Sequence, residues 1–284
     1  MTIVDIGIAA FGTSRPIWCS NLIGMILSSA ENADIKIGSI HAVSSAVPDW
    51  NKNNMILEGK GRAEKTDVNR VKITRDFLSG KADWLFQIDD DTTPPPDALA
   101  RLLTAQRNFI AGVYFNPSKP HNPIAYLRDE TSGLYEPLYG YPKGTLIQVN
   151  SVGMGCTLIH RSVFEKIYAE HRVFTRPDGS IFAIHESAIR DNPAVFNDGF
   201  TTTKAYIENG FYHVPVVEVE KDERPFPFYA MEYGRTEDHW FCELAANVGI
   251  RPWVDTTVTC GHLKLRSTDE KTYDEEALSW MNEK

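Results

Sequence analysis

The chain contains 284 residues, of which 42% are hydrophobic and 24% charged, as in globular proteins that bury a core of their own. Its formal net charge of -9 argues against a general duplex-binding surface, because contacts to phosphates supply most non-specific affinity for nucleic acid; a local basic patch is still allowed. No apolar run approaches the ~20 residues of a membrane span, and the four cysteines lack CxxC or zinc-like spacing. We therefore expect a cytoplasmic protein with reduced thiols.

The first 115 residues alternate between apolar runs typical of strands and segments with helical spacing. The first run contains one acidic residue, Asp5, and still indicates a buried strand. The pattern predicts strands at 3–10, 35–45, 83–89 and 109–115, and helices at 18–30, 68–78 and 97–106. Such a succession favours a mainly parallel, doubly wound sheet, in which ligands bind at the carboxyl ends of the strands.

The second half of the chain is less regular. Residues 116–143 are rich in Pro and Tyr and indicate loops with one hairpin, and a polar stretch extends to about residue 204. We expect strands at 146–160 and 253–263, one or two strands within 206–219, helices at 162–171 and 237–247, and an acidic C-terminal helix at about 268–284. With no repeat or low-complexity tract, the economical interpretation is a single α/β domain over residues 1–284.

Three consecutive carboxylates, Asp89, Asp90 and Asp91, end the predicted strand at 83–89. They repel one another and disfavour a strand interior, so we place them at its end. Pleating would put Asp89 and Asp91 on one face and Asp90 on the other. Two roles remain open. A hard divalent cation bridging to a diphosphate would balance the charge, or the triplet is a solvated turn before the next helix.

Two later motifs contain further polar candidates. Thr236 is a plausible N-cap, and Glu237 and Asp238 in the first turn would favour the helix dipole. His262 follows the strand at 253–263 and, taken alone, is an ordinary satisfied histidine. Helix and returning strand can nevertheless bring Glu237, Asp238 and His262 to the edge of the sheet that holds Asp89 and Asp91. Imidazole could there serve as a further metal ligand.

Three segments together resemble GT-A glycosyltransferases, and are closest to the family 2-like members of bacteria and bacteriophages. They are ADWLFQIDDDTTPPPDAL, VNSVGMGCTLIHRSVFEKI and TEDHWFCELAANVGIRPWVDTTVTCGHL, in the family's order. The similarity spans about residues 68–263. It implies a nucleotide-binding half at about 1–115, an acceptor-side half at about 116–265, and a bacterial or phage-infected cytoplasm.

The resemblance also implies site residues. Asp89 and Asp91 match the DxD motif, with Asp91 binding Mn²⁺ or Mg²⁺ directly and Asp89 contacting the donor or the metal through water; Asp90 belongs to the same donor-binding motif. His262 matches a late metal-ligand histidine, and Glu237 and Asp238 match the acidic pair that holds the general base of inverting members. Residues that would contact the donor are Arg70, Thr13, Arg15, Gly153 and Gly155.

These residue types suit sugar transfer from a nucleotide-sugar, in which a cation stabilises the leaving diphosphate and a carboxylate accepts the proton of the acceptor hydroxyl. The same motif order occurs in retaining enzymes, where Asp238 would only position or stabilise. The glycines have an alternative role in tight packing or a bulge. Residues 221–235, with Phe226, Phe228 and Tyr229, are a candidate lid or an ordinary surface loop.

Two other functions compete with this interpretation. A nucleotidyltransferase acting on sugar phosphates shares a related scaffold, but the first loop, FGTSRPIW, lacks the Gly-rich basic sequence that such enzymes usually carry. A non-catalytic nucleotide-sugar-binding module would have little use for both the metal ligands and the acidic pair. The donor expected is a UDP-sugar. The acceptor is open between a glycan, a protein and a modified base in phage DNA, and no membrane anchor favours a lipid.

Overall fold

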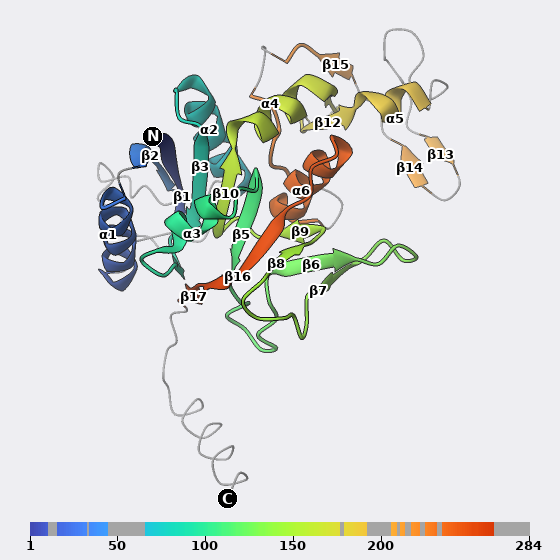
Figure 1. The fold of residues 1–284 in the computed structure, drawn as a ribbon. Coiled ribbons are helices and arrows are strands. Elements are labelled where there is room, and N and C mark those ends of the chain that lie inside the picture. The colour runs from blue at the N-terminus through green and yellow to red at the C-terminus, as the bar shows by residue number, and fades with distance from the viewer. Residues whose placement is uncertain are drawn as a thin grey trace, which may run out of the picture.

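The chain forms an α/β fold around one seven-stranded sheet in this computed structural model (Figure 1). The structure describes residues 1–10, 16–32, 34–44, 66–176, 179–191, 206–208, 211–213, 217–221, 225–231 and 235–263. Among them, none of the helices combines the length and apolar character needed to cross a membrane. The predicted residues Thr13 and Arg15 and the predicted C-terminal helix lie outside these ranges.

The central sheet is mainly parallel, as the sequence predicts. Five strands run in one direction, namely β1 (Thr2–Ala10), β2 (Ile35–Ser44), β3 (Trp84–Asp89), β5 (Phe109–Val113) and β16 (Trp253–Thr259). In the order β2-β1-β3-β10-β5-β16-β8, the antiparallel strand β10 (Cys156–His160) separates β3 from β5. Strand β8 (Leu146–Gln148) closes the other edge, antiparallel to β16. The sequence pattern did not reveal the insertion of β10, because hydrophobic periodicity carries no strand direction.

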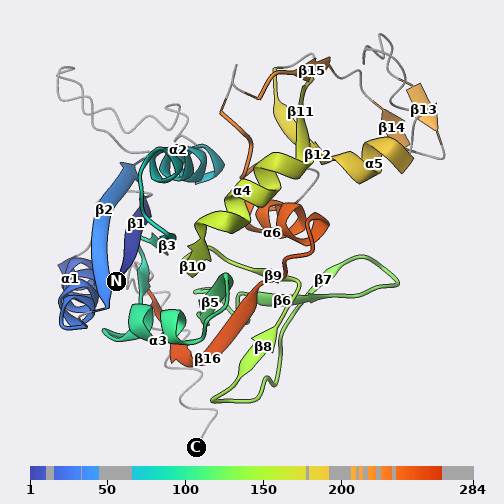
Figure 2. The same ribbon diagram turned by 45° about the horizontal axis from the view of Figure 1, so that its top comes forward.

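Helices cover both faces of the sheet (Figure 2). On one face lie α1 (Pro16–Ala30) and α3 (Ala98–Thr104), and on the other lie α2 (Thr66–Ser79), α4 (Arg161–Glu170) and α6 (Glu237–Asn247). The strands divide their side chains between the two layers with period two. Phe86 and Ile88 of β3 pack toward α1 and α3, whereas Leu85 packs toward α2. Asp89 follows that alternation and therefore faces α2.

The buried acid in the first strand has a local role. Asp5 is 3% exposed, and its Oδ1 accepts a hydrogen bond from the Ser39 amide at 2.6 Å. Its Oδ2 lies 2.9 Å from His41 Nε2 on the neighbouring strand. A Cβ at Gly38 would lie 2.3 Å from Asp5 Oδ1, so only glycine fits beside the carboxylate. Asp5 thus holds β2 against β1 where their register shifts.

The second half of the chain contains more regular structure than we predicted. The expected strand at 146–160 is three short strands, because β9 (Ser151–Val152) pairs with the hairpin of β6 (Ala125–Arg128) and β7 (Tyr135–Pro137), while β8 and β10 belong to the central sheet. The polar stretch includes β11 (His171–Thr175), β12 (Ile181–His185) and α5 (Glu186–Asp191). The described residues within 206–219 belong to three short strands, β13 (Tyr206–Glu208), β14 (Phe211–His213) and β15 (Val217–Val219).

Candidate active site

The acidic triplet lies where β3 ends, and a small two-stranded sheet brings His262 close to it. Strand β17 (Gly261–His262) pairs antiparallel with β4 (Thr92–Thr93), which places His262 opposite Thr92. The amide of Leu263 also donates to the Asp91 carbonyl at 2.7 Å. Residues that are about 170 positions apart in the sequence therefore become backbone neighbours at the carboxyl edge of the sheet.

His262 is held with one ring nitrogen directed at Asp91. Its Nδ1 donates to the Phe115 carbonyl at 2.7 Å, and its Nε2 lies 3.2 Å from Asp91 Oδ2. Burial alone would lower the pKa of His262, but Asp91 and the Phe115 carbonyl outweigh it and the pKa is raised. A carbonyl bonded to one nitrogen fixes the tautomer and leaves the other nitrogen available as a ligand, the arrangement commonly seen behind metal-binding histidines.

These residues fit a hard divalent cation held jointly with a substrate. No group of three or more His, Cys, Asp or Glu side chains is arranged as a complete metal site within the described ranges. Asp91 and His262 would instead supply two ligands, and Mg²⁺-type cations commonly take their remaining ligands from substrate phosphates and water. Beside the pair, Thr92 Oγ1 is buried without a hydrogen-bond partner. That unsatisfied oxygen indicates that the protein alone does not complete the polar contacts of this edge.

Arg70 is the centre of a buried charge cluster on the same edge. Its side chain is 2% exposed, and Nη2 donates to Asp89 Oδ1 at 2.8 Å while Nη1 donates to Gln87 Oε1 at 3.2 Å. Its Nε lies 3.5 Å from Glu237 Oε1 and 3.8 Å from Asp238 Oδ1 and forms no hydrogen bond. Burial would lower the pKa of Arg70, but the three carboxylates raise it, so the guanidinium stays charged. One cation thus faces three acids.

Asp238 is the less satisfied member of the acidic pair. Helix α6 begins at Glu237, with Thr236 at the N-cap position but without a hydrogen bond from the Thr236 side chain. Asp238 Oδ1 is buried and has no hydrogen-bond partner. Burial, and next the charge of Glu237, raises the pKa of Asp238 well above its usual range. A carboxylate with a raised pKa accepts a proton more readily near neutral pH, which is the property of a general base.

The two predicted glycines lie beside the DxD motif in a tightly packed turn. A Cβ at Gly155 would lie 2.9 Å from each of Asp89 Oδ2, Thr92 Oγ1 and Tyr114 Cζ. A Cβ at Gly153 would lie 2.0 Å from the Tyr114 hydroxyl. Both positions therefore require glycine because the turn is tightly packed. Tight packing is the alternative role that the sequence analysis gave to these two glycines. Contact with a donor sugar stays a prediction.

Other predicted residues are more deeply buried than the Asp91–His262 pair. Asp90 is 7% exposed, so unlike Asp91 it lies beneath the surface of the turn. For the aromatic residues of 221–235, the predictions of a lid and of an ordinary surface loop are both wrong. Phe226, Phe228 and Tyr229 are at most 6% exposed and pack in the main core. Phe228 meets Phe164 edge to face with centroids 5.5 Å apart, and Tyr229 stacks on Phe241 at 4.9 Å.

Two residues of the site, Gln87 and Tyr114, were missed by the sequence interpretation. Gln87 bridges Arg70 to the hydroxyl of Tyr229, and its polar side chain in the middle of an apolar strand was the available signal. Tyr114 directly follows β5 and packs under both glycines. Nothing in the sequence pattern distinguishes Tyr114 from ordinary core aromatics, because its partners come from distant segments.

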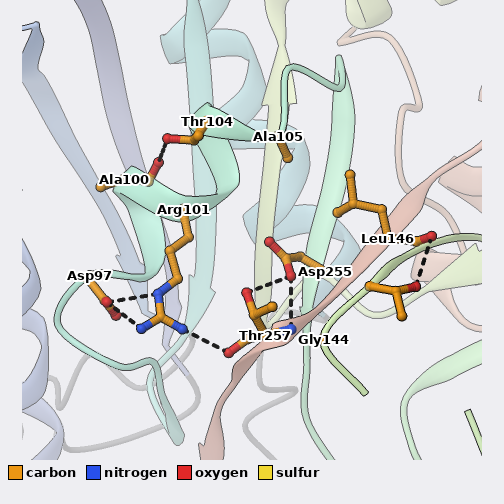
Figure 3. Close-up of a pocket in the computed structure, with 10 residues that line it drawn as sticks. Asp97, Ala100, Arg101, Thr104, Ala105, Gly144, Leu146, Asp255 and Thr257 are labelled. Carbon is orange, nitrogen blue, oxygen red and sulfur yellow. Dashed lines mark hydrogen bonds and ion pairs between the residues drawn. The ribbon is translucent and has the colours of Figure 1, made fainter. Parts of the chain in front are cut away.

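A separate cavity of about 500 Å³ lies between α3 and β16 (Figure 3). The charged side chains that line it already have hydrogen-bond partners within the protein. Arg101 Nε donates to Asp97 Oδ2 at 2.7 Å and Nη1 donates to the Thr257 carbonyl at 3.0 Å. Asp255 Oδ1 accepts from the amide and hydroxyl of Thr257. This cavity gathers none of the predicted site residues, so the carboxyl edge of the sheet is the stronger candidate.

No protein-family model and no curated protein matches the chain. Among solved structures, it is similar to the A197 protein from STIV, with 14% identity, a TM-score of 0.42, and coverage of 93% of this chain and 87% of that one. A glycosyltransferase involved in the glycosylation of the major capsid of PBCV-1 has 9% identity, a TM-score of 0.28, and coverage of 58% and 62%. GalNAc-T7 with UDP, GalNAc and Mn²⁺ has 12% identity, a TM-score of 0.43, and coverage of 93% and 44%. The chain thus spans less than two thirds of the last two proteins.

Proposed function

We propose that this chain is a metal-dependent glycosyltransferase of the GT-A type, which moves a sugar from a UDP-sugar to a hydroxyl of its acceptor. The observation that supports this most directly is the meeting of three separate polar elements at one sheet edge. They are the Asp91–His262 pair, the Arg70–Asp89 pair, and Asp238 at the start of α6. Metal ligands, an anchored cation and a candidate base are the parts that such a transfer requires.

On this proposal, Asp91 and His262 hold Mn²⁺ or Mg²⁺ against the diphosphate. When bound, the cation supplies charge stabilisation for the leaving nucleoside diphosphate. Burial raises the pKa of Asp89, and the charge of Arg70 opposes that rise. Through the 2.8 Å hydrogen bond, Arg70 also fixes the Asp89 carboxyl so that it can orient the donor. Thr13, Arg15, Asp90, Gly153 and Gly155 stay as proposed donor contacts, although their roles rest on the sequence resemblance.

Asp238 is the proposed base, with Glu237 as its neighbour. Asp238 Oδ1 has no hydrogen-bond partner among the described residues, and the raised pKa of Asp238 favours transfer of a proton to it from an acceptor hydroxyl. The whole chain would act as one domain, with its nucleotide side at about 1–115 and its acceptor side at about 116–265. The acceptor on this proposal is a glycan, a protein or a modified base in phage DNA.

The test is calorimetric titration of UDP, with and without Mn²⁺, into the parent and into Asp91→Ala and His262→Ala. We expect Mn²⁺ to strengthen UDP binding to the parent, and each variant to lose that gain while it keeps a cooperative thermal transition. Asp76→Ala and His185→Ala are matched controls, because these residues lie outside the cluster, paired with Arg75 and Glu170. If the two site variants bind UDP and Mn²⁺ like the parent, the metal site and the proposal fail.

A product assay separates the competing functions. Incubation with UDP-hexoses and Mn²⁺ should release UDP, either to water or to an added acceptor. A nucleotidyltransferase would instead form UTP and a sugar phosphate when pyrophosphate is added. A binding module would show the calorimetric signal without any product.

A further inference from the structure

Tyr114 contacts both halves of the proposed site from a position just after β5. Its side chain is buried, with 3% of its surface exposed. Its hydroxyl oxygen accepts a hydrogen bond from the Gly155 amide at 3.0 Å. Its ring meets the His262 ring edge to face, with centroids 5.7 Å apart. The same side chain therefore touches the glycine turn beside Asp89 and the histidine beside Asp91.

The backbone around Tyr114 reinforces this double contact. The Tyr114 carbonyl accepts from Ile124, whose own carbonyl accepts from Gly153 at 3.3 Å. The next carbonyl, that of Phe115, holds His262 Nδ1. Burial, followed by the charges of Asp238 and Asp89, raises the pKa of the Tyr114 hydroxyl, which keeps it neutral. Two consecutive residues thus set the distance between the turn and the histidine.

We propose that Tyr114 is a positioning residue that holds the Gly153–Gly155 turn against the donor sugar, while its ring supports the orientation of His262. The two contacts are separable because one uses the hydroxyl and the other uses the ring. Removal of the hydroxyl should release the turn and leave the Asp91–His262 pair in place. This inference rests on the proposed binding of a nucleotide-sugar.

Tyr114→Phe tests the hydroxyl. We expect the variant to bind UDP with Mn²⁺ as the parent does, but to lose affinity for a UDP-hexose relative to UDP by roughly tenfold, the effect of one lost hydrogen bond. Tyr114→Leu, which also removes the ring, should in addition reduce the Mn²⁺-dependent gain in UDP affinity. A residue that only stabilises the fold would change both affinities alike. Tyr135→Phe is the matched control, because its hydroxyl bonds Glu243 instead.

A spectroscopic measurement checks the same contact without any ligand. Met154–Gly155 is the only Met-Gly pair in the sequence, so labelling methionine carbonyls with ¹³C and glycine amides with ¹⁵N isolates the Gly155 signal. The Gly155 amide proton should shift upfield in Tyr114→Phe, with no shift in Tyr135→Phe. An unchanged signal, or an unchanged ratio of UDP-hexose to UDP affinity, would overturn the inference. A parent that binds neither ligand would instead defeat the proposed function, and this inference with it.

Discussion

Two arginines lie near opposite ends of helix α2, Arg70 within its first half and Arg161 against its C-terminal end, and their donors find hydrogen-bond partners to very different degrees. Arg161 donates hydrogen bonds to four carbonyls at the C-terminal end of α2, those of Phe77, Leu78, Gly80 and Ala82, at 2.8–3.1 Å. Arg70, in the first half of the same helix, makes two hydrogen bonds, and its Nε has none. Arg161 cancels the partial negative charge of a helix end. Arg70 is surrounded by more acid than it can neutralise.

This comparison indicates that the two edges of the sheet have different roles. At the amino edge the Arg161 guanidinium and the carbonyls that it binds satisfy one another, which stabilises the fold. At the carboxyl edge Arg70 Nε, Asp238 Oδ1 and Thr92 Oγ1 are buried without partners. Such groups cost stability unless a ligand completes them, and they concentrate at functional sites. Removal of an uncompensated acid at the carboxyl edge should therefore reduce activity with little loss of stability. Removal of Arg70, the cation that offsets these acids, or of Arg161 at the amino edge should reduce stability.

The largest expected effect is that of Asp238→Asn on catalysis. Loss of a general base typically reduces the rate ~10²–10⁴-fold. The free energy of unfolding should stay the same or rise, because the substitution removes a charge that burial and Glu237 disfavour. Release of UDP from a UDP-hexose measures the first quantity and urea denaturation the second. A near-parental rate would assign the base elsewhere, with Glu237 as the next candidate.

Arg70→Met should destabilise the fold most. It leaves Asp89, Glu237 and Asp238 without a buried cation, and the loss of one partner from a buried ion pair typically costs about 3–5 kcal/mol. Urea denaturation at neutral pH measures the effect. Arg75→Met is the control on the same helix, since Arg75 is 60% exposed and its loss should change stability by no more than about 0.5 kcal/mol. Equal effects for the two variants would contradict a structural role for the cluster.

Arg161→Met should cost less, about 1–3 kcal/mol, because four carbonyls lose a donor but some regain water at the half-exposed helix end. Binding of UDP with Mn²⁺ should be unchanged, in contrast to Asp91→Ala and His262→Ala at the carboxyl edge. Thermal unfolding and calorimetry on one preparation check both statements. A selective loss of nucleotide affinity would show that the two edges are coupled.

The smallest expected effect concerns acid stability and His171, which lies beyond the amino edge. Its Nδ1 donates to the Ile167 carbonyl at 2.8 Å, whereas its Nε2 is buried without a partner. Burial lowers the pKa of His171 to about 4, so between the unfolded value of about 6.5 and pH 4 the unfolded chain binds a proton that the folded chain does not. The free energy of unfolding should therefore fall as the pH drops through this range.

His171→Gln should remove about 1–2 kcal/mol of that pH dependence, because glutamine does not titrate. Urea denaturation of parent and variant at pH 7 and pH 4.5 gives the difference. His121→Gln, at an exposed histidine, is the control. The same pH dependence in parent and His171→Gln would refute the assignment to His171.

The sequence correctly predicted the elements in which hydrophobic residues recur at a regular spacing without interruption. Helix α6 has the predicted bounds of 237–247, and β1 differs by one residue from the predicted 3–10. Prediction was poorest between residues 146 and 219, where strands of two to five residues are too short to show a period. The direction of β10 and the division of 146–160 among two sheets depend on pairing with β3, β5 and β6, which local sequence does not encode.

The site shows the same division. The sequence by itself singled out Asp89, Asp91, Glu237, Asp238 and His262 as candidates, because acids and a histidine gathered at predicted strand and helix ends suit a ligand site better than a packed core. Arg70 was a candidate only through the resemblance to glycosyltransferases. Only the tertiary structure placed Arg70 among three carboxylates, and only it showed that the aromatic residues of 225–229 belong to the core. The roles of Tyr114 and Gln87 were likewise undecided until folding, because a buried hydroxyl or amide acquires a function only from the partner that packs against it.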